Sequence, residues 1–242
     1  LMRKEQIAAL TYATDSNSGL SQINALSIEQ AKALNGVQVA GMSTAAIAAM
    51  RESQIQALGA SVILAMTTDQ VNRLRTGQVA ALSTIQLQAM EARDVASLTT
   101  EAVNALTAAQ VSVLSPAQLL ALSTQQIRAI STQGIAALSG AQISKLRNDQ
   151  IAVLTAGNDA QLGSTNPQGP DQVGALSSTQ MQSLRMDQVA ALTSQQMRSL
   201  SSTQLNALSL KQMQSVDVQD IAALTTGQIS ALKVADIAEL TS

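Results

Sequence analysis

The stretch from Leu122 to Leu138 reads LSTQQIRAISTQGIAAL and contains two copies of one eight-residue pattern. Ser123 and Gln126 have the spacing of a capping box, in which a serine begins a helix and a glutamine at its third position (N3) bonds back to it. Leu122 and Ile127 flank this box at the positions of a hydrophobic staple. The stretch therefore predicts that each eight-residue unit, here called an octad, begins a short helix of its own.

The octad, written S/T-x-x-Q-I-x-A-L, repeats along nearly the whole chain. Two apolar positions mark it: an isoleucine slot and, three residues later, a leucine slot. The isoleucine slot recurs every eight residues from Ile23 through Ile127 to Ile151 and resumes at Val173. Methionines also occupy these two slots, where they are expected to fill the core: Met42, Met50, Met66, Met90, Met181, Met197 and Met213.

A helix of about six residues is too short to be stable alone, so the octads must be stabilised by stacking on one another. Toward the C-terminus, successive octads alternate between two types: Met181 is followed two residues later by Ser183, and Val189 by Ala191. This alternation suggests a structural unit of 16 residues. The prediction is an all-α solenoid of very short capped helices, one per octad and two per 16-residue coil.

Two other architectures fit the octad less well. In a continuous helix, eight residues advance about 800°, so the apolar stripe would rotate by about 80° with every octad and could not face one partner. In a β-solenoid, the isoleucine and leucine slots would point to opposite faces of a strand. Composition also favours helix over strand, and the β-solenoid stays open as the alternative.

Irregular segments divide the chain into a solenoid at 1–154, an insertion loop at 155–172 and a continuation of the same rod at 173–242. Residues 12–19 (YATDSNSG) form an irregular octad that keeps the phase. The phase changes in the insertion, since the step from Ile151 to Val173 is not a multiple of eight. This loop is expected to lie on the surface, with a hinge or contact loop as the other possibility.

Composition excludes several classes of function. The chain has no His and no Cys, which removes thiol and Ser-His-Asp chemistry, ordinary zinc sites and disulfides. Lys and Arg number 14 against 16 Asp and Glu, scattered singly, so nucleic acid is not an expected partner. The chain contains no run of 18 apolar residues, so the sequence predicts no membrane span. We therefore expect that the chain is not an enzyme and that it has no catalytic, cofactor-binding or metal site.

Carboxylates come singly, mostly at the second or third position of an expected helix, where negative charge suits the helix dipole. These are Asp69, Asp94, Asp149, Asp187, Asp220 and Asp236, while Asp15 and Asp159 lie in the irregular segments. Basic residues replace the cap at Arg51, Arg75, Arg147, Arg185 and Lys233. Acidic residues follow within three positions of most of these, so local ion pairs are expected rather than a row that binds anions.

The octads resemble the tandem repeats of very large secreted or surface proteins of proteobacteria, often described as adhesin-like. The matching stretches are ALSTQQI (121–127), NALTAAQV (104–111) and AALTTGQI (222–229). The resemblance implies an extracellular stalk, matrix or filament component, and it identifies no binding residue.

The expected function is structural and non-catalytic: an extracellular rod, stalk or self-assembling filament. Leu1 and Ser242 both lie within ordinary octads, which suggests a piece of a longer repetitive protein and ends that stack head to tail. A binding partner on the cell surface or in the matrix is consistent with this expected function. The alternative is a solenoid that binds a protein or glycan, although Tyr12 is the only aromatic residue.

Overall fold

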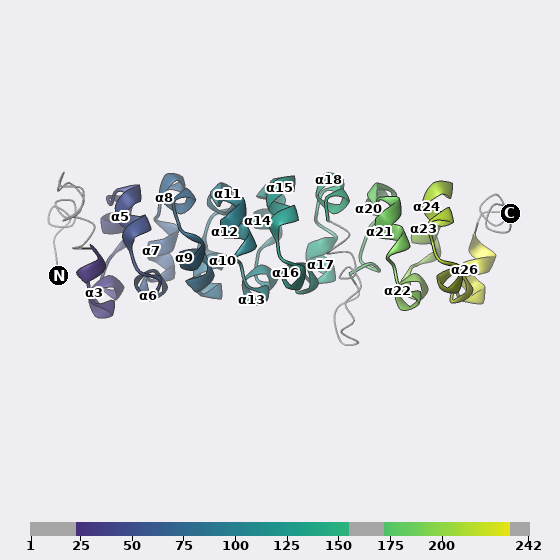
Figure 1. Ribbon diagram of the computed structural model, residues 1–242, viewed down its shortest axis with the longest axis horizontal. Helices are drawn as coiled ribbons and strands as arrows, with labels where there is room; N and C mark the ends of the chain where they lie inside the picture. The colour runs from purple at the N-terminus through teal and green to yellow at the C-terminus, as the bar shows by residue number, and fades with distance from the viewer. Residues whose placement is uncertain (1–22, 155–171, 233–242) are drawn as a thin grey trace. The chain divides into compact units, whose positions relative to one another are not determined.

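The computed structural model describes residues 23–154 and 172–232, and Figure 1 draws the remaining residues as a grey trace. The chain divides into two compact units, residues 1–122 and 123–242, and each is described by itself. Within the described ranges the regular structure is entirely helical, so the β-solenoid alternative is wrong for this part of the chain. None of the helices described has the length and apolar character needed to cross a membrane.

The helices are four to six residues long and recur with the octad. Unit 1 contains α3 (Ile28–Lys32), α4 (Gly36–Ala40), α5 (Thr44–Ala49), α6 (Glu52–Ala57), α7 (Ala60–Leu64), α8 (Thr68–Asn72), α9 (Thr76–Ala81), α10 (Thr84–Ala89), α11 (Ala92–Ser97), α12 (Thr100–Asn104), α13 (Ala108–Ser112) and α14 (Pro116–Ala121). Unit 2 contains α15 (Thr124–Ala129), α16 (Thr132–Ala136), α17 (Gly140–Ile143), α18 (Asn148–Ala152), α20 (Ser178–Ser183), α21 (Met186–Ala190), α22 (Ser194–Ser199), α23 (Ser202–Leu205), α24 (Leu210–Gln214), α25 (Val218–Ala222) and α26 (Thr226–Ala231).

The predicted capping boxes are confirmed. At α15, Ser123 is extended (φ −68°, ψ 162°) and its Oγ accepts a hydrogen bond from the Gln126 N–H at 3.2 Å. The Gln126 Oε1 accepts in return from the Ser123 N–H at 2.8 Å. Pro116 lies at the first position of α14, where its missing N–H costs no helical bond. One octad therefore makes one short helix and one extended cap residue.

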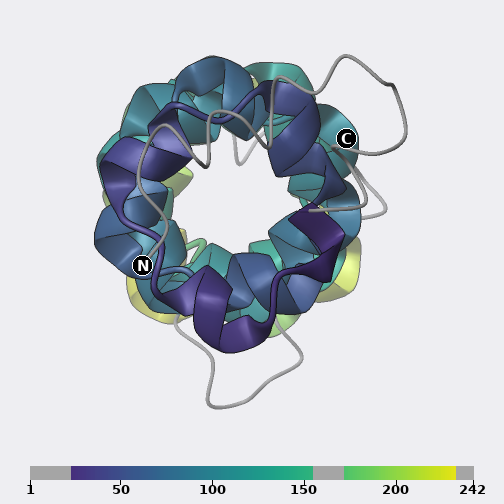
Figure 2. The same ribbon diagram turned by 90° about the vertical axis from the view of Figure 1, so that its left-hand side faces the viewer.

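The helices wind into a coil whose turn is longer than two octads. In unit 1 the extensive helix contacts join third neighbours, as in α3 with α6, α7 with α10 and α11 with α14. Unit 2 repeats this pattern in α15 with α18, α20 with α23 and α23 with α26. Figure 2 shows the first helices of unit 1 (purple to blue) following one another around a ring, with later helices of the same unit behind them.

The predicted 16-residue coil of two helices is therefore wrong, although the helical solenoid itself is confirmed. A two-helix coil would stack each helix on its second neighbour, whereas the contacts within each unit, apart from α18 with α20 across the insertion, join third neighbours. The number of octads per turn depends on the bend at each extended cap residue, which the octad pattern does not specify. The alternation at Met181 and Val189 has no counterpart in burial, since both side chains are 0% exposed.

The two apolar slots form the core. Ile127 and Leu122 are 0% exposed, as the staple predicts. The seven methionines expected in the core are all at most 5% exposed, so their assignment to the interior is confirmed. Buried apolar area of this kind is the main stabilising contribution, and it is made between turns of the coil rather than within one helix.

Candidate functional site

The most regular chemical feature of the coil is a row of glutamines at N3, here called the glutamine ladder. Gln110 is 2% exposed, and its Oε1 accepts a hydrogen bond from the Thr107 N–H at 2.8 Å. Its Nε2 donates to the carbonyl oxygens of Val79 and Leu82, 31 and 28 residues earlier, both at 2.8 Å. Pairs of carbonyls at the same two spacings accept from Gln54, Gln70, Gln78, Gln86 and Gln118 in unit 1, and from Gln204, Gln212 and Gln228 in unit 2.

Within the described residues the buried Gln172 Oε1 and Gln196 Nε2 have no hydrogen-bond partner. Each amide with both kinds of bond acts in two places at once. Its oxygen caps its own helix, while its nitrogen reaches carbonyls at the C-terminal end of the helix four octads earlier. The Val79 carbonyl already accepts from the Leu82 N–H at 3.2 Å, and a carbonyl oxygen can accept a second hydrogen bond. A buried amide without partners would be costly, whereas each net hydrogen bond contributes roughly 1 kcal/mol. The ladder therefore joins successive turns of the coil through polar bonds inside an apolar core.

The sequence predicted these glutamines as capping residues and missed their second bond. A capping box accepts Glu as readily as Gln at N3. In this chain no octad carries Glu at that position, although most carry Gln. Only the amide offers a donor as well as an acceptor. The consistent choice of Gln over Glu was the signal for a second partner.

Three glutamines of unit 2 have six extra residues between themselves and their acceptors, because the insertion lies between the two. The Gln172 Nε2 donates to the carbonyls of Ile135 (3.0 Å) and Leu138 (2.6 Å), 37 and 34 residues earlier. Gln180 and Gln188 show the same two spacings. The expected insertion loop, 155–172, lies outside the described residues apart from Gln172. The spacings on either side show that it adds six residues while the bonding pattern is retained.

Deleting residues 163–168 is expected to leave the thermal unfolding midpoint of the chain nearly unchanged. The sequence at 155–162 (TAGNDAQL) and at 169–176 (GPDQVGAL) has octad spacing, so 163–168 (GSTNPQ) are the six extra residues. Without them Gln172 stands at the same spacing from its two acceptors as the ladder glutamines of unit 1. Deleting 169–174 instead removes Gln172 and should lower the midpoint. Equal losses in circular-dichroism melts of the two deletions would contradict the assignment.

Two of the arginines at N-cap positions form the predicted local ion pairs. In α18, Arg147 Nε lies 3.0 Å from Asp149 Oδ1. In α21, Arg185 Nη2 lies 2.7 Å from Asp187 Oδ2, and Arg185 Nε donates to the other oxygen at 2.9 Å. Both pairs lie on the surface, so each contributes little to stability.

Arg51 and Arg75 bond to the neighbouring turn of the coil, a contact that the prediction of local ion pairs missed. Their Nη2 atoms donate to the carbonyl oxygens of Leu26 (2.8 Å) and Met50 (2.9 Å), 25 residues earlier. The same two oxygens also accept from ladder glutamines. A guanidinium is long enough to cross to the neighbouring turn, so these cations reinforce the ladder. The fifth basic cap residue, Lys233, lies outside the described residues.

Replacing Arg185 with Gln is expected to raise the pKa of Asp187. The hydrogen bond from Arg185, aided by its charge, holds the pKa of this carboxyl below its ordinary value of 3.8. A lowered folded-state pKa stabilises the fold at pH values above the ordinary pKa, and the contribution is lost as pH falls through the lowered value. The effect on stability is small because the Asp187 side chain is 50% exposed.

The measurement is a carboxyl-carbon NMR titration of Asp187 in the wild type and in Arg185→Gln. Arg198→Gln, a change at an exposed arginine of α22, is the control and should leave the titration unchanged. An identical Asp187 titration with and without Arg185 would show that the ion pair does not persist in solution.

Two aspartates occupy ladder positions. Asp94 at N3 of α11 is 3% exposed, and the Thr68 hydroxyl donates to its Oδ1 at 2.7 Å. Asp220 at N3 of α25 accepts from the Ser194 hydroxyl in the same way, again across 26 residues. A carboxylate cannot donate to carbonyl oxygens, so a hydroxyl–carboxylate bond replaces the ladder bond at these two points.

The other described carboxylates agree with the sequence prediction for helix starts. Asp69, Asp149 and Asp187 all lie at N2 of their helices. Asp15, Asp159 and Asp236 lie outside the described residues. Within residues 23–154 and 172–232, no three acidic residues gather in a group that could hold a metal ion.

Asp94→Gln is expected to stabilise unit 1 by about 1 kcal/mol. The amide would supply a donor to the carbonyls of Ile63 and Met66, which hold the places of the two acceptors in a complete ladder. Thr68 is exposed and can bond to water instead. Chemical denaturation measures the change, and Asp69→Gln at a neighbouring exposed position is the control. A loss of stability at Asp94→Gln alone would mean that the Thr68 bond outweighs a ladder bond.

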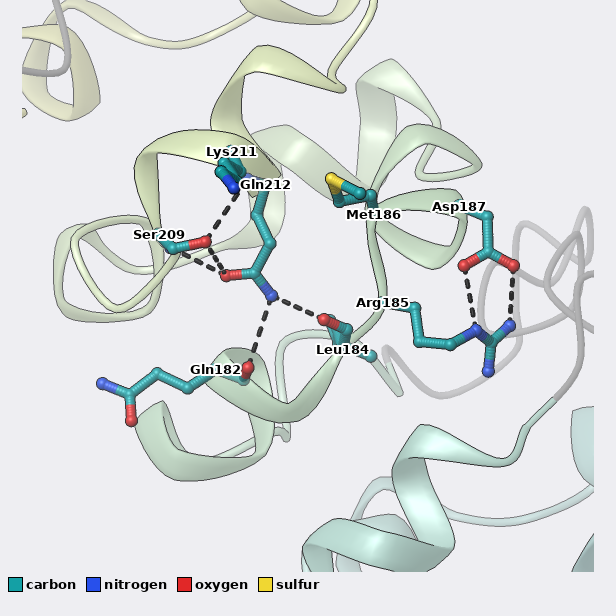
Figure 3. Close-up of a pocket in the computed structure, with 8 residues that line it drawn as sticks. All are labelled: Gln182, Leu184, Arg185, Met186, Asp187, Ser209, Lys211 and Gln212. Carbon is teal, nitrogen blue, oxygen red and sulfur yellow. Dashed lines mark hydrogen bonds and ion pairs between the residues drawn. The ribbon is translucent and has the colours of Figure 1, made fainter.

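The described surface of unit 2 is hollowed between α21 and α24 (Figure 3). The hollow has a volume of about 660 Å³. Gln212 lies in its wall, with its Nε2 bonded to the Leu184 carbonyl at 2.6 Å, and Arg185 and Asp187 pair with each other. Met186 is 54% exposed beside them, and Lys211 also lines the hollow. The lining of the hollow is therefore partly apolar and partly charged.

Three stretches of the chain, residues 47–84, 87–124 and 120–156, match a family model described as the ALTTAQ repeat. The first stretch contains Gln78 with both of its carbonyl partners, and the second contains Gln118 with both of its own. Among curated proteins, the comparison finds no match to the chain. The chain is a helical repeat protein, and these stretches of its octads are similar to the ALTTAQ repeat.

Proposed function

We propose that the chain is a structural, non-catalytic repeat protein that forms a rigid rod, stalk or self-assembling filament outside the cell. The glutamine ladder is the observation that carries this proposal. The polar side chain that recurs most regularly is bound on both sides within the coil, so the repeated chemistry serves the architecture. Repeats that contact only nearby turns extend in one dimension as octads are added.

The extracellular location rests on the resemblance of the octads to large secreted and surface repeat proteins. Such a location is tested by labelling intact source cells with an antibody to the chain. Signal on unbroken cells supports it, and signal only after lysis overturns it. This part of the proposal is independent of the rod itself.

Small-angle X-ray scattering of the monomeric chain tests the rod. A compact protein of this length has a radius of gyration of about 18 Å. A rod gives a clearly larger value, and a chain lengthened by four further octads should increase it again without changing the cross-section. A value near that of a compact protein would overturn the proposed function.

A binding module for a protein or glycan is the second candidate, and the hollow between α21 and α24 favours it. Exposed Met186 and the cationic Lys211 offer mixed apolar and charged contact in one place. Glycan-array and pull-down experiments with wild type and Met186→Glu distinguish the candidates. Binding that depends on Met186 would favour the module, whereas a chain that binds nothing through this surface fits a spacer.

A further inference from the structure

Asn35 and Gly36 form the only Asn-Gly pair in the sequence. In such a pair the backbone nitrogen of the glycine can attack the side-chain amide carbon of the asparagine, because glycine has no Cβ to hinder the approach. Asn35 is the N-cap of α4, and Gly36 is the first residue of that helix. The pair therefore lies where an extended cap residue meets a helix start.

Packing between two turns of the coil requires the glycine. A Cβ at position 36 would lie 2.6 Å from the Cβ of Ala65, the residue that ends α7. The Cβ of Ala65 is fixed to its own backbone, so a larger residue at position 36 would push α4 away from α7, with which it is in contact. The fold thus keeps, next to Asn35, the one residue type that leaves its amide open to attack.

Asn35 is exposed because of its place in the octad, since Thr107 and Ser123 at the same position are exposed as well. The Asn35 Oδ1 accepts a hydrogen bond from the Gln38 N–H at 3.0 Å. Its Nδ2 makes no hydrogen bond within the described residues. The Gly36 N–H likewise has no acceptor there, as is usual in the first turn of a helix. Both nitrogens that the reaction would use are therefore unengaged.

The other asparagines lack this combination. Every one of them is followed by a residue that has a Cβ. The Asn72 Nδ2 donates to the Ser97 carbonyl oxygen at 2.6 Å, and the bulky Arg73 follows it. The Asn206 Nδ2 is also held by a carbonyl oxygen, at 2.8 Å. Attack by the following nitrogen is hindered at these positions.

We propose that Asn35 is a site of spontaneous deamidation, a covalent modification that changes the start of α4. The Gly36 nitrogen loses its proton to the solvent and forms a bond to the Asn35 Cγ, while the bond from Cγ to Nδ2 breaks. The amide nitrogen takes up a proton and leaves as ammonia, and a succinimide ring remains. Water then opens the ring at either carbonyl, which gives aspartate or isoaspartate. The reaction involves no oxidation or reduction and consumes only water.

The reaction requires a brief opening of the cap. Asn35 has a ψ of 169°, and its side chain is bonded to Gln38, so the amide carbon must turn toward the Gly36 nitrogen. An exposed hydrogen bond at a helix end opens locally without unfolding the rest of the coil. We therefore expect the folded chain to react more slowly than a free peptide of the same sequence, but faster at Asn35 than at its other asparagines.

The two products affect α4 differently. Aspartate at position 35 keeps a side-chain oxygen for the cap and adds a negative charge at the helix start, where it is favourable. Isoaspartate places an additional methylene in the main chain between the cap and Gly36, so it should loosen the contact of α4 with α7. This modification goes beyond the proposed function and does not depend on it.

Peptide mapping by mass spectrometry tests the site after incubation of the folded full chain at mildly alkaline pH. Trypsin cleaves after Lys32 and Arg51, so the peptide 33–51 contains Asn35 as its only asparagine. It should gain about 1 Da and divide into two products, one of which matches the same peptide from Asn35→Asp. The peptide 52–73 contains only Asn72 and should keep its mass.

Asn35→Ser supplies the usual cap residue without an amide, so its peptide 33–51 should keep its mass under the same conditions. Asn35→Asp should melt at the wild-type temperature, whereas the isoaspartate fraction of aged wild type should melt at a lower one. An isoaspartate fraction that melts like wild type would contradict the expected effect on α4.

Two results would overturn the site itself. One is an unchanged peptide 33–51 from the folded chain under conditions in which the free peptide 33–51 deamidates, because the cap would then protect Asn35 fully. The other is an equal mass gain in Asn35→Ser, which would place the reaction at another residue. Neither result touches the rod, which scattering tests separately.

Discussion

Ile127→Asp is expected to destabilise unit 2 by about 4 kcal/mol or more. The wild-type side chain is 0% exposed in α15, so the substitution removes core contacts and places a carboxylate in an apolar interior. Truncation alone costs roughly 2–5 kcal/mol at such a site, and burial of the charge adds to it. The thermal unfolding transition should shift to lower temperature and broaden.

Unfolding should begin around α15 before it spreads to the rest of unit 2. A coil contacts only its nearest turns, so one damaged octad weakens its neighbours first. Hydrogen exchange should therefore show lost protection in α15 and in α18, which packs against it. Helices such as α23 and α26, several turns away in the same unit, should keep more of their protection.

Arg128→Asp is the matched control, since Arg128 adjoins Ile127 and is exposed. It introduces the same side chain on the solvent side of the same helix and should change stability by less than about 0.5 kcal/mol. Equal losses at the two positions would contradict the assignment of inward and outward faces. No loss at Ile127 would contradict the shared core.

The local level of this fold could be predicted from the sequence because its signals are local. Ser123, Gln126 and Ile127 specify a cap, a helix start and a buried position within five residues, and the structure places all three as predicted. The position of Pro116 at a helix start and the burial of the methionines follow from equally short-range rules.

The number of octads per turn could not be predicted in this way. It depends on how much the chain bends at each extended cap residue, and that angle leaves no trace in a pattern that repeats identically every eight residues. The 16-residue alternation near Met181 suggested a two-helix coil because side-chain type varied there, while burial did not. Long-range partners such as Arg51 with the Leu26 carbonyl depend on the same bend.

Gln110→Glu is expected to destabilise unit 1 by about 3 kcal/mol or more at pH 7. The substitution keeps the shape of the side chain and the oxygen that accepts from Thr107. It replaces the Nε2 donor with a second acceptor that faces the carbonyls of Val79 and Leu82 at 2.8 Å. An ionised carboxylate at this site, where the wild-type side chain is 2% exposed, would face two carbonyl oxygens without solvent to stabilise its charge.

The pH dependence of this variant separates the ladder bond from simple packing. Burial beside two carbonyls should raise the folded-state pKa of the new carboxyl at position 110 above the ordinary glutamate value of about 4.3. The destabilisation is then present at pH values above this raised pKa. It should diminish as pH falls toward the ordinary value, because the protonated carboxyl can donate one hydrogen bond. Chemical denaturation at several pH values, compared with wild type under the same conditions, measures the difference.

Gln125→Glu, at an exposed N2 position, makes the same chemical change and should cost less than about 0.5 kcal/mol at any of these pH values. Gln110→Met keeps the volume but removes both polar ends, so its loss should be the same at every pH. A Gln110→Glu variant as stable as wild type at pH 7 would mean that the cap alone explains the glutamine. The preference for Gln over Glu at N3 would then need another cause, since the turn-to-turn bond would contribute nothing that distinguishes the two side chains.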